Sequence, residues 1–392
     1  MTNAQRIRRV TAGLLAGMIL ALAIGFFAAN KQDFSENENR YLAKLPSPGW
    51  EDIKSGAYMQ GLSDYASDHF FFRDFFIGLK AKAETALGRK EINGVYIAGD
   101  GYLIEAYKSG ENTERIAGIL KSFAQELEGQ EAETQETEAQ ETEGQEPRLR
   151  LMLVPTAVYV YEDRLPAHVQ TKNQMETAEA VYRAAGIVPI DCSQALLEQK
   201  NGEPLYYRTD HHWTTRGAYE GYRVFCENMG FEAVPLAEMA AETVTEDFRG
   251  TIYSKTGDYS RKGDSITIYT NPADRLTVSY LDTGEVTDSL YNLEYTEKKD
   301  KYSLFLDNLH SLIEITNETA GSDRELALIK DSYANSMVPF LAHHYKKIYV
   351  FDTRYYKQGP SAFIKEHPGI TDVLILYNMN TLDSDLGIRG IY

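Results

Sequence analysis

Short apolar runs alternate with helical segments from residue 149 to the end of this 392-residue chain, and this alternation constrains the fold more than any other feature. The apolar runs are 149–155, 186–190, 326–329, 347–351 and 372–377. Helical segments at 175–185, 215–229 and 334–345 separate several of them. Strands that alternate with helices favour an α/β domain with a mainly parallel sheet. Residues 248–310 are rich in Thr, Tyr, Ser, Gly and Asp, which predicts a β-rich insertion in that domain.

The N-terminus predicts a membrane segment. Arg6, Arg8 and Arg9 precede an apolar run over residues 10–29. Twenty helical residues span about 30 Å, the thickness of the hydrocarbon core of a bilayer. Residues 1–30 are therefore predicted to be a cytoplasmic stub and a transmembrane signal-anchor, because the arginines stay on the cytoplasmic side. The alternative is a cleaved signal peptide and a secreted protein. Both interpretations place the rest of the chain outside the cytoplasm, at the cell surface.

Composition excludes several classes of protein. The chain has 58 acidic and 40 basic residues and a formal net charge of −18, so its surface repels phosphate backbones and no nucleic-acid partner is expected. The two cysteines, Cys192 and Cys226, are too few for a disulfide scaffold or a four-thiolate zinc site. They either pair or stay as buried thiols. The 43% of hydrophobic residues is enough to bury a core.

The regions between these features differ in composition. We predict that residues 31–56 form an extended tether and that residues 57–392 form the main domain. Within that domain, residues 128–146 carry eight glutamates, no basic residue and no large apolar side chain. Such a segment cannot contribute to a core, so we predict a disordered acidic insertion.

A phenylalanine-rich segment near the start of the domain shows helical spacing. Its apolar residues are Phe70, Phe71, Phe72, Phe75, Phe76 and Leu79. An apolar face at this spacing is typical of an amphipathic helix packed on a core. We therefore predict a core-facing helix in preference to a binding surface.

The densest cluster of reactive side chains is Asp210-His211-His212-Trp213, at the start of a predicted helix. Asp210 is placed to orient and stabilise an imidazolium, and His212 to act as a general base. The alternative is structural: Asp210 or Thr214 caps the helix, and the histidines have no catalytic role.

A second candidate is Ser332, where the apolar strand 326–329 leads through Lys330 and Asp331 into a helix. This places Ser332 at the carboxyl end of a strand, where ligands bind in open α/β sheets. The amino end of a helix also favours an oxyanion. Ser332 is thus a candidate nucleophile that needs a base. A plain helix cap is the alternative for Ser332 taken alone.

The segment 209–219, which contains Asp210-His211-His212-Trp213, resembles the signature of the DHHW proteins. These are related to AlgX and AlgJ, SGNH-hydrolase-like proteins that acetylate the polysaccharide alginate. Residues 38–42 resemble the family's segment after the anchor, and 93–103 its first hairpin. Asp331-Ser332-Tyr333 looks like its nucleophile turn. Together these matches cover most of residues 35–380.

The resemblance implies a three-layer α/β/α domain of the SGNH-hydrolase type with a catalytic triad of Ser332, His212 and Asp210. It implies no cofactor and no metal. Further candidates for substrate or oxyanion binding are Arg354, Asn378, Tyr333 and His211. The alternative for Arg354 is that it is a solvated surface residue without a binding role. For the oxyanion donor either Asn378 or Asn380 is a candidate, and the alternative for both is a structural role in a turn. Lys330 departs from the family pattern, in which glycine precedes the nucleophile turn.

The implied function is O-acetyl transfer to, or removal from, a cell-surface polysaccharide. The acyl donor would be supplied by a membrane-bound O-acyltransferase as partner. An alternative is a noncatalytic glycan-binding or cell-envelope assembly protein that keeps the fold. A third hypothesis is a phosphoesterase that binds manganese or zinc through Asp210, His211 and His212, with His343 and His344. The further aspartate-rich motifs of such enzymes are not evident in the sequence.

Overall fold

The computed structural model describes residues 2–108, 112–129, 147–384 and 387–391. The chain forms two compact units. The smaller unit consists of Met1–Ile92 and Tyr253–Arg261, and the larger of Asn93–Ile252 and Lys262–Tyr392. The predicted domain limits stay predictions. The predicted acidic insertion at 128–146 lies outside the described residues from position 130 onward.

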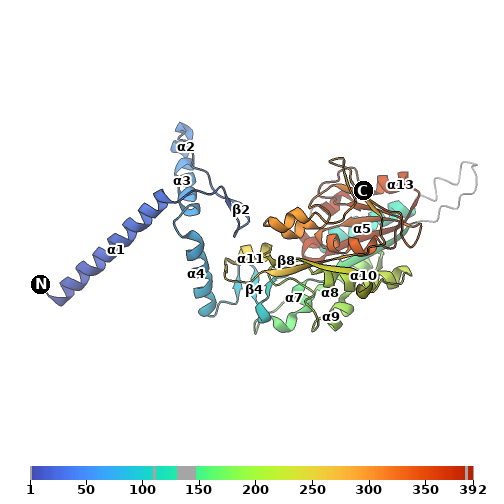
Figure 1. Ribbon diagram of the computed structural model, residues 1–392, viewed down its shortest axis with the longest axis horizontal. Coiled ribbons are helices and arrows are strands. Elements are labelled where there is room, and N and C mark those ends of the chain that lie inside the picture. Colours follow the sequence, from blue (N-terminus) through green and yellow to red (C-terminus); the bar gives the residue numbers. More distant parts are fainter. Residues whose placement is uncertain (1, 109–111, 130–146, 385–386, 392) are drawn as a thin grey trace, which may run out of the picture. The chain divides into compact units, whose positions relative to one another are not determined.

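The larger unit is built on an eight-stranded sheet, as far as the described residues show (Figure 1). Its order is β11-β10-β12-β14-β13-β15-β6-β7. The strands are β6 (Arg148–Val154), β7 (Val188–Pro189), β10 (Leu276–Tyr280), β11 (Glu285–Thr287), β12 (Leu312–Asn317), β13 (Glu325–Lys330), β14 (Lys347–Phe351) and β15 (Ile370–Asn378). The pairings are parallel from β14 to β7 and antiparallel from β14 to β11. The predicted mixed α/β fold with a mainly parallel sheet is confirmed.

Helices cover both faces of this sheet. The connections β6–α8–β7 and β14–α13–β15 step toward the β7 edge, whereas β13–α12–β14 steps toward the β11 edge. Because such crossovers are right-handed, α8 and α13 lie on one face and α12 on the other. Helix α5 packs on α8 and α13, and α10 packs on α9 and α12. These helices are α5 (Thr113–Glu128), α8 (Gln174–Ala185), α9 (Ser193–Gln199), α10 (Thr215–Met229), α12 (Val338–Leu341) and α13 (Pro360–Glu366).

The topology places the end of β13 at a special position. The chain leaves β13 for β14 on one side and returns from β14 to β15 on the other side. Crossovers thus diverge beside β13, and ligands of open α/β sheets bind at such a point. Since β13 is covered on both faces, its residues from Leu326 to Lys330 are all buried, as the continuous apolar run predicts.

Smaller elements surround the sheet. The segment predicted as a β-rich insertion contributes β10 and β11 to the main sheet, and its β9 (Asp264–Thr270) pairs antiparallel with β8 (Ala240–Phe248). Strands β4 (Val95–Ile97) and β5 (Leu103–Glu105) pair as a hairpin. The larger unit also contains α7 (Ala157–Val160) and α14 (Met379–Ser384), β3 (Glu91–Ile92) ends the first segment of the smaller unit, and α11 (Thr251–Thr256) contains residues of both units.

The smaller unit begins with α1 (Asn3–Ala28), shown in blue in Figure 1. Among the described residues it is the one helix that is long and apolar enough to cross a membrane, with a mean hydropathy of 2.3 over its most apolar window. A hairpin of β1 (Phe34–Ser35) and β2 (Arg40–Tyr41) follows. The unit continues with α2 (Trp50–Ser55), α3 (Ala57–Asp68) and α4 (Arg73–Ala86).

The phenylalanine-rich segment is helical over α4, but its predicted packing is wrong. The α4 stripe, which we define as Phe72, Phe75, Phe76 and Leu79, is exposed by 63%, 63%, 42% and 51%. A different face of α4 packs against the segment that contains Gly257. Ile77 lies so close to Gly257 that a Cβ added at Gly257 would lie 2.8 Å from Cγ2 of Ile77. Helical spacing shows that apolar residues share a face, but it does not show what covers that face.

Candidate active site

Ser332 lies on a tightly held turn after β13. Asp331 caps the short 3₁₀ helix Ser332–Ser336, and its Oδ1 accepts a hydrogen bond from the Tyr333 amide at 2.9 Å. Its Oδ2 accepts from the Asn378 amide at 2.7 Å and from Asn378 Nδ2 at 2.6 Å. These contacts fasten the turn to the carboxyl end of the neighbouring parallel strand β15. Ser332 itself stays partly accessible, whereas Asp331 is fully buried.

The Asp-His-His-Trp loop is joined to the same turn from the amino end of α10. Trp213 is fully buried, and its Nε1 donates a hydrogen bond to the Tyr333 carbonyl at 2.9 Å. In return, the Tyr333 hydroxyl donates to the His211 carbonyl at 2.5 Å. The predicted site residue Tyr333 is thus buried between the two segments. These reciprocal bonds fix the loop against the serine turn.

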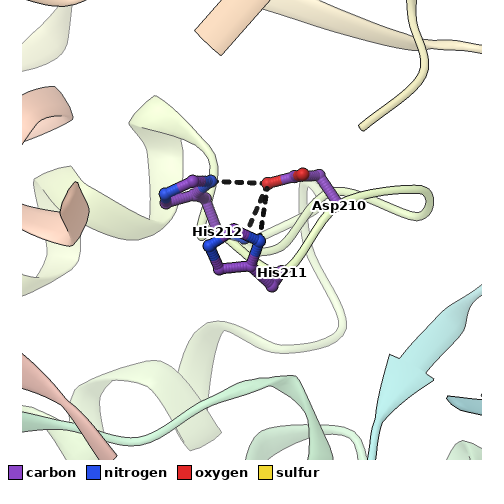
Figure 2. Close-up of side chains that lie close together, drawn as sticks. All are labelled: Asp210, His211 and His212. Carbon is purple, nitrogen blue, oxygen red and sulfur yellow. Dashed lines mark hydrogen bonds and ion pairs between the residues drawn. The ribbon is translucent and has the colours of Figure 1, made fainter. Parts of the chain in front are cut away.

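The three predicted triad residues lie in hydrogen-bonded series. His212 Nε2 lies 2.7 Å from Ser332 Oγ, and His212 Nδ1 lies 2.5 Å from Asp210 Oδ1. Figure 2 shows the rings of His211 and His212 near the same oxygen of the Asp210 carboxylate, Oδ1, with Nδ1 of each ring closest to it. Because an ionised carboxylate only accepts, His212 donates from Nδ1, which leaves Nε2 free to accept the serine proton.

Asp210 is oriented from its other oxygen. Oδ2 accepts hydrogen bonds from the Thr251 amide at 2.8 Å and from Thr251 Oγ1 at 3.1 Å. The preceding residue, Gly250, leaves the room for this contact, because a Cβ there would lie 2.1 Å from Asp210 Oδ2. Both carboxylate oxygens are therefore engaged, and the orientation of the His212 ring follows from them.

The environment keeps this pair in the protonation states that a base requires. Burial by itself would raise the pKa of Asp210, but the adjacent imidazoles of His211 and His212 outweigh it and hold that pKa well below its ordinary value. Burial, and after it the charge of His211, lower the pKa of His212 to about 4, although Asp210 opposes the shift. At neutral pH the imidazole is therefore neutral and the carboxylate ionised.

Sequence reasoning missed three residues that shape the site, namely Tyr302, Gly250 and Thr251. The ring of Tyr302 stacks on that of His212, with centroids 3.7 Å apart and an angle of 10° between the planes. Its hydroxyl lies 3.0 Å from the Ser332 carbonyl oxygen. All three lie within residues 248–310, the predicted β-rich insertion. The glycine at position 250 is the only local signal among the three in the sequence, and a single glycine indicates no more than a turn.

Arg354 is positioned by an acidic partner. Its Nε and Nη2 donate to the two oxygens of the fully buried Asp352, at 2.8 and 2.5 Å. Arg354 lies near enough to His212 for its charge to contribute to the low pKa of that ring. Lys330, the departure from the family pattern, is 2% exposed, and its Nζ lies 3.5 Å from the same carboxylate. Burial lowers the pKa of Lys330, and Asp352 opposes that shift.

The other candidates have structural partners. Asn378 Nδ2 donates to Asp331 Oδ2 and to Thr381 Oγ1, which uses both of its amide hydrogens. Asn380 Oδ1 accepts from Gln174 at 3.4 Å. Burial raises the pKa of Asp331 to about 6, against the hydrogen bonds from Asn378 and Tyr333 that lower it. Asn378 thus holds the turn that carries Ser332, whereas the side chain of Asn380 contacts Gln174.

The geometry gives little support to a metal centre. Within the described part of the chain, one group could hold an ion, Asp210, His211 and His212, whose donor atoms lie within 4.8 Å of one another. Both ring nitrogens of His212 are already engaged, by Asp210 and by Ser332. His211 Nδ1 lies 2.8 Å from Thr251 Oγ1. His343 pairs with Asp274 and His344 with Tyr222, so the predicted second pair of histidines has other partners.

The fold and this arrangement define an SGNH-hydrolase-like protein: a three-layer α/β/α domain with serine, histidine and aspartate in series at the carboxyl end of a parallel strand. A family model described as "DHHW protein" matches residues 121–351, and the chain belongs to this family. The resemblance seen in the sequence is confirmed.

The chain is also similar to several solved structures. A DHHW family protein from Eubacterium siraeum is 26% identical, with a TM-score of 0.64 over 77% of this chain and 95% of its own. Bacillus cereus PatB1, solved with a sulfonyl adduct, is 20% identical, with a TM-score of 0.60 over 76% of this chain and 98% of its own. The O-acetyltransferase domain of Pseudomonas putida AlgJ is 13% identical, with a TM-score of 0.44 over 74% of this chain and 93% of its own. No curated protein matches the chain.

Proposed function

We propose that the protein is an extracytoplasmic O-acetyltransferase or acetylesterase that acts on a cell-surface polysaccharide. Ser332 is the nucleophile, His212 the general base and Asp210 the residue that orients it. The observation that carries this proposal is the unbroken hydrogen-bonded series from Ser332 Oγ through His212 to Asp210. A serine that served only to cap a helix would not need a buried neutral imidazole at its hydroxyl.

The residues perform two half-reactions. As Ser332 Oγ bonds to the acyl carbon, its proton passes to His212 Nε2, and Asp210 stabilises the imidazolium. The leaving group departs with that proton, and an acetyl-serine remains. An acceptor hydroxyl then gives its proton to His212 and attacks the acyl carbon, so the new ester forms and Ser332 is restored. A sugar hydroxyl as acceptor gives transfer, and water gives hydrolysis.

The acetyl group and the glycan acceptor are proposed from the resemblance to the DHHW proteins and their alginate-acetylating relatives. The same resemblance suggests a membrane-bound O-acyltransferase as the donor of acyl groups. Placement outside the cytoplasm rests on α1, whose length and hydropathy suit a membrane anchor or a signal sequence. The mechanism itself uses side chains alone and calls for no cofactor.

The test is covalent trapping in the full-length protein, kept in detergent or nanodiscs. With p-nitrophenyl acetate we expect a burst of nitrophenol and an acetyl-sized mass increase that maps to Ser332. A sulfonyl fluoride should label the same residue; PatB1, which has the same fold, was solved with a sulfonyl adduct. Ser279→Ala, on the distant strand β10, is the matched control and should keep both adducts. A folded protein that forms neither would favour the noncatalytic glycan-binding alternative.

A further inference from the structure

Helix α4 carries two apolar faces, and one of them is uncovered. The α4 stripe recurs at positions i, i+3, i+4 and i+7, with Phe72 and Phe75 each 63% exposed. The ring of Phe70, itself 40% exposed, packs on that of Phe76 with centroids 5.8 Å apart. The inward face of the same helix is separate and already packs on the 253–261 segment. A contiguous exposed apolar patch of this kind marks a surface of interaction.

The patch begins where the apolar helix α1 ends. Phe71 lies against Gly25 in the last turns of α1, with ring carbons 2.5 Å from where a Cβ would stand. The ring of Phe26 meets that of Tyr65 on α3 at 6.3 Å, edge to face. The corner between α3 and α4 is thus packed on the end of α1, as the smaller unit in Figure 1 shows. Phe72, the first residue of the stripe, follows directly after Phe71.

We propose that the α4 stripe is a membrane-contact surface that inserts into the interfacial region of the bilayer crossed by α1. This inference rests on the proposed role of α1 as an anchor. Apolar faces of amphipathic helices enter the boundary between headgroups and acyl chains by about 5–10 Å. Aromatic side chains are enriched at that depth. A lipid surface is favoured over a protein groove because the stripe continues from the end of an apolar helix of spanning length.

The chemistry of the stripe also predicts how binding responds to lipid charge. Its residues carry no charge, and the whole chain has a formal net charge of −18. Insertion should therefore be driven by apolar burial and not by attraction to anionic headgroups. Membranes of uncharged phosphatidylcholine should suffice, and added salt should not release the stripe.

The experiment places an environment-sensitive fluorophore on the stripe of the full-length protein in phosphatidylcholine nanodiscs. Phe75→Cys carries the probe, and Lys80→Cys, on the same helix but outside the stripe, is the matched control. Cys192 and Cys226 are 0% and 1% exposed, so they do not compete for labelling in the folded protein. We expect lipids brominated on their acyl chains to quench the probe at position 75 at least about threefold more than at position 80. Aqueous iodide should give the reverse order.

Three results would overturn the proposal. Equal quenching by iodide at positions 75 and 80 would show that the stripe is exposed to water. Protection from iodide without quenching by brominated lipid would show that protein covers it. A chain that does not enter nanodiscs would remove the anchor on which the inference rests. Trapping of Ser332 by p-nitrophenyl acetate in the same Phe75→Cys sample keeps any such failure distinct from failure of the proposed catalytic function.

Discussion

Two aromatic-rich parts of the chain differ in the burial of their side chains. In the loop before α10, Tyr206 and Trp213 are fully buried, whereas in the α4 stripe the phenylalanines are exposed. The difference follows from their polar groups. The Tyr206 hydroxyl donates to the Pro155 carbonyl at 2.6 Å, and the Trp213 indole donates to Tyr333. Tyrosine and tryptophan thus find specific partners when buried. Phenylalanine has no such group, and its burial depends only on whether another apolar surface is present.

The largest difference between the two regions should be in the rate of acyl-enzyme formation when their residues are substituted. Ser332→Ala and His212→Ala should each slow formation of the acyl-enzyme by about 10³-fold or more, because the members of a triad act as a unit. Phe75→Ala should leave that rate within about twofold, since the residue carries no catalytic group. Stopped-flow bursts with p-nitrophenyl acetate measure both. A burst of native size in Ser332→Ala would refute the mechanism.

Stability should distinguish the regions next. Trp213→Ala removes a fully buried indole and its hydrogen bond, which should cost about 3–5 kcal/mol in the free energy of unfolding. Phe75→Ala, at an exposed position, should change that free energy by about 0.5 kcal/mol or less. Denaturant titration of the detergent-solubilised chain measures both. Comparable losses would mean that the stripe is part of a core.

The site also depends on a glycine that holds no reactive group. In Gly250→Ala the new methyl group would stand 2.1 Å from Asp210 Oδ2, so the carboxylate must shift and His212 loses its orientation. We expect about a 10²-fold loss of kcat/KM, smaller than the loss of about 10⁴-fold that follows when the orienting aspartate of a triad is itself replaced. Gly118→Ala on α5 is the control, because its Cβ would meet nothing within 4 Å. Equal activity of the two variants would show that the Thr251–Asp210 contact is dispensable.

Tyr302 should act by positioning. Tyr302→Phe keeps the ring that stacks on His212 but loses the hydroxyl near the Ser332 carbonyl, and we expect about a threefold to tenfold loss of kcat. Tyr302→Leu loses the stack as well and should be slower still. Because burial by this ring contributes to the low pKa of His212, only the leucine variant should shift the pH profile. Identical profiles in the two variants would argue for a purely structural role.

The pH dependence is the subtlest effect. Since burial lowers the pKa of His212 to about 4, the base stays neutral above that pH, and kcat/KM should fall only as the pH drops through about 4. An unperturbed histidine would lose activity near pH 6.5, about its ordinary pKa. His211→Gln removes a neighbouring imidazole that lowers this pKa, so the acidic limb should move upward. A limb that stays in place would show that His211 has no electrostatic influence.

The sequence allowed part of this site to be predicted, and the reason is local. Asp210 and His212 are two residues apart, and Ser332 directly follows a strand and its capping aspartate, so both groups are visible in short windows. Tyr302 and Gly250 approach His212 and Asp210 only through the fold, and no periodicity reports contacts over such separations. Asn378 was predicted at the correct strand end, yet its amide is used to hold Asp331. Likewise, the spacing on α4 predicted the helix but not its surroundings.

The division of the site between two segments of the chain bears on how the proposed activity could be switched. The proposed base, His212, and the carboxylate of Asp210 belong to a single loop, whereas the proposed nucleophile, Ser332, belongs to another segment. A displacement of that loop would carry Asp210 and His212 together and preserve their mutual geometry. If the loop keeps its internal geometry, only one distance between the two segments has to be correct, the distance between His212 and Ser332. A bound glycan that closed or opened this single gap would turn the reaction on or off without disassembling the base.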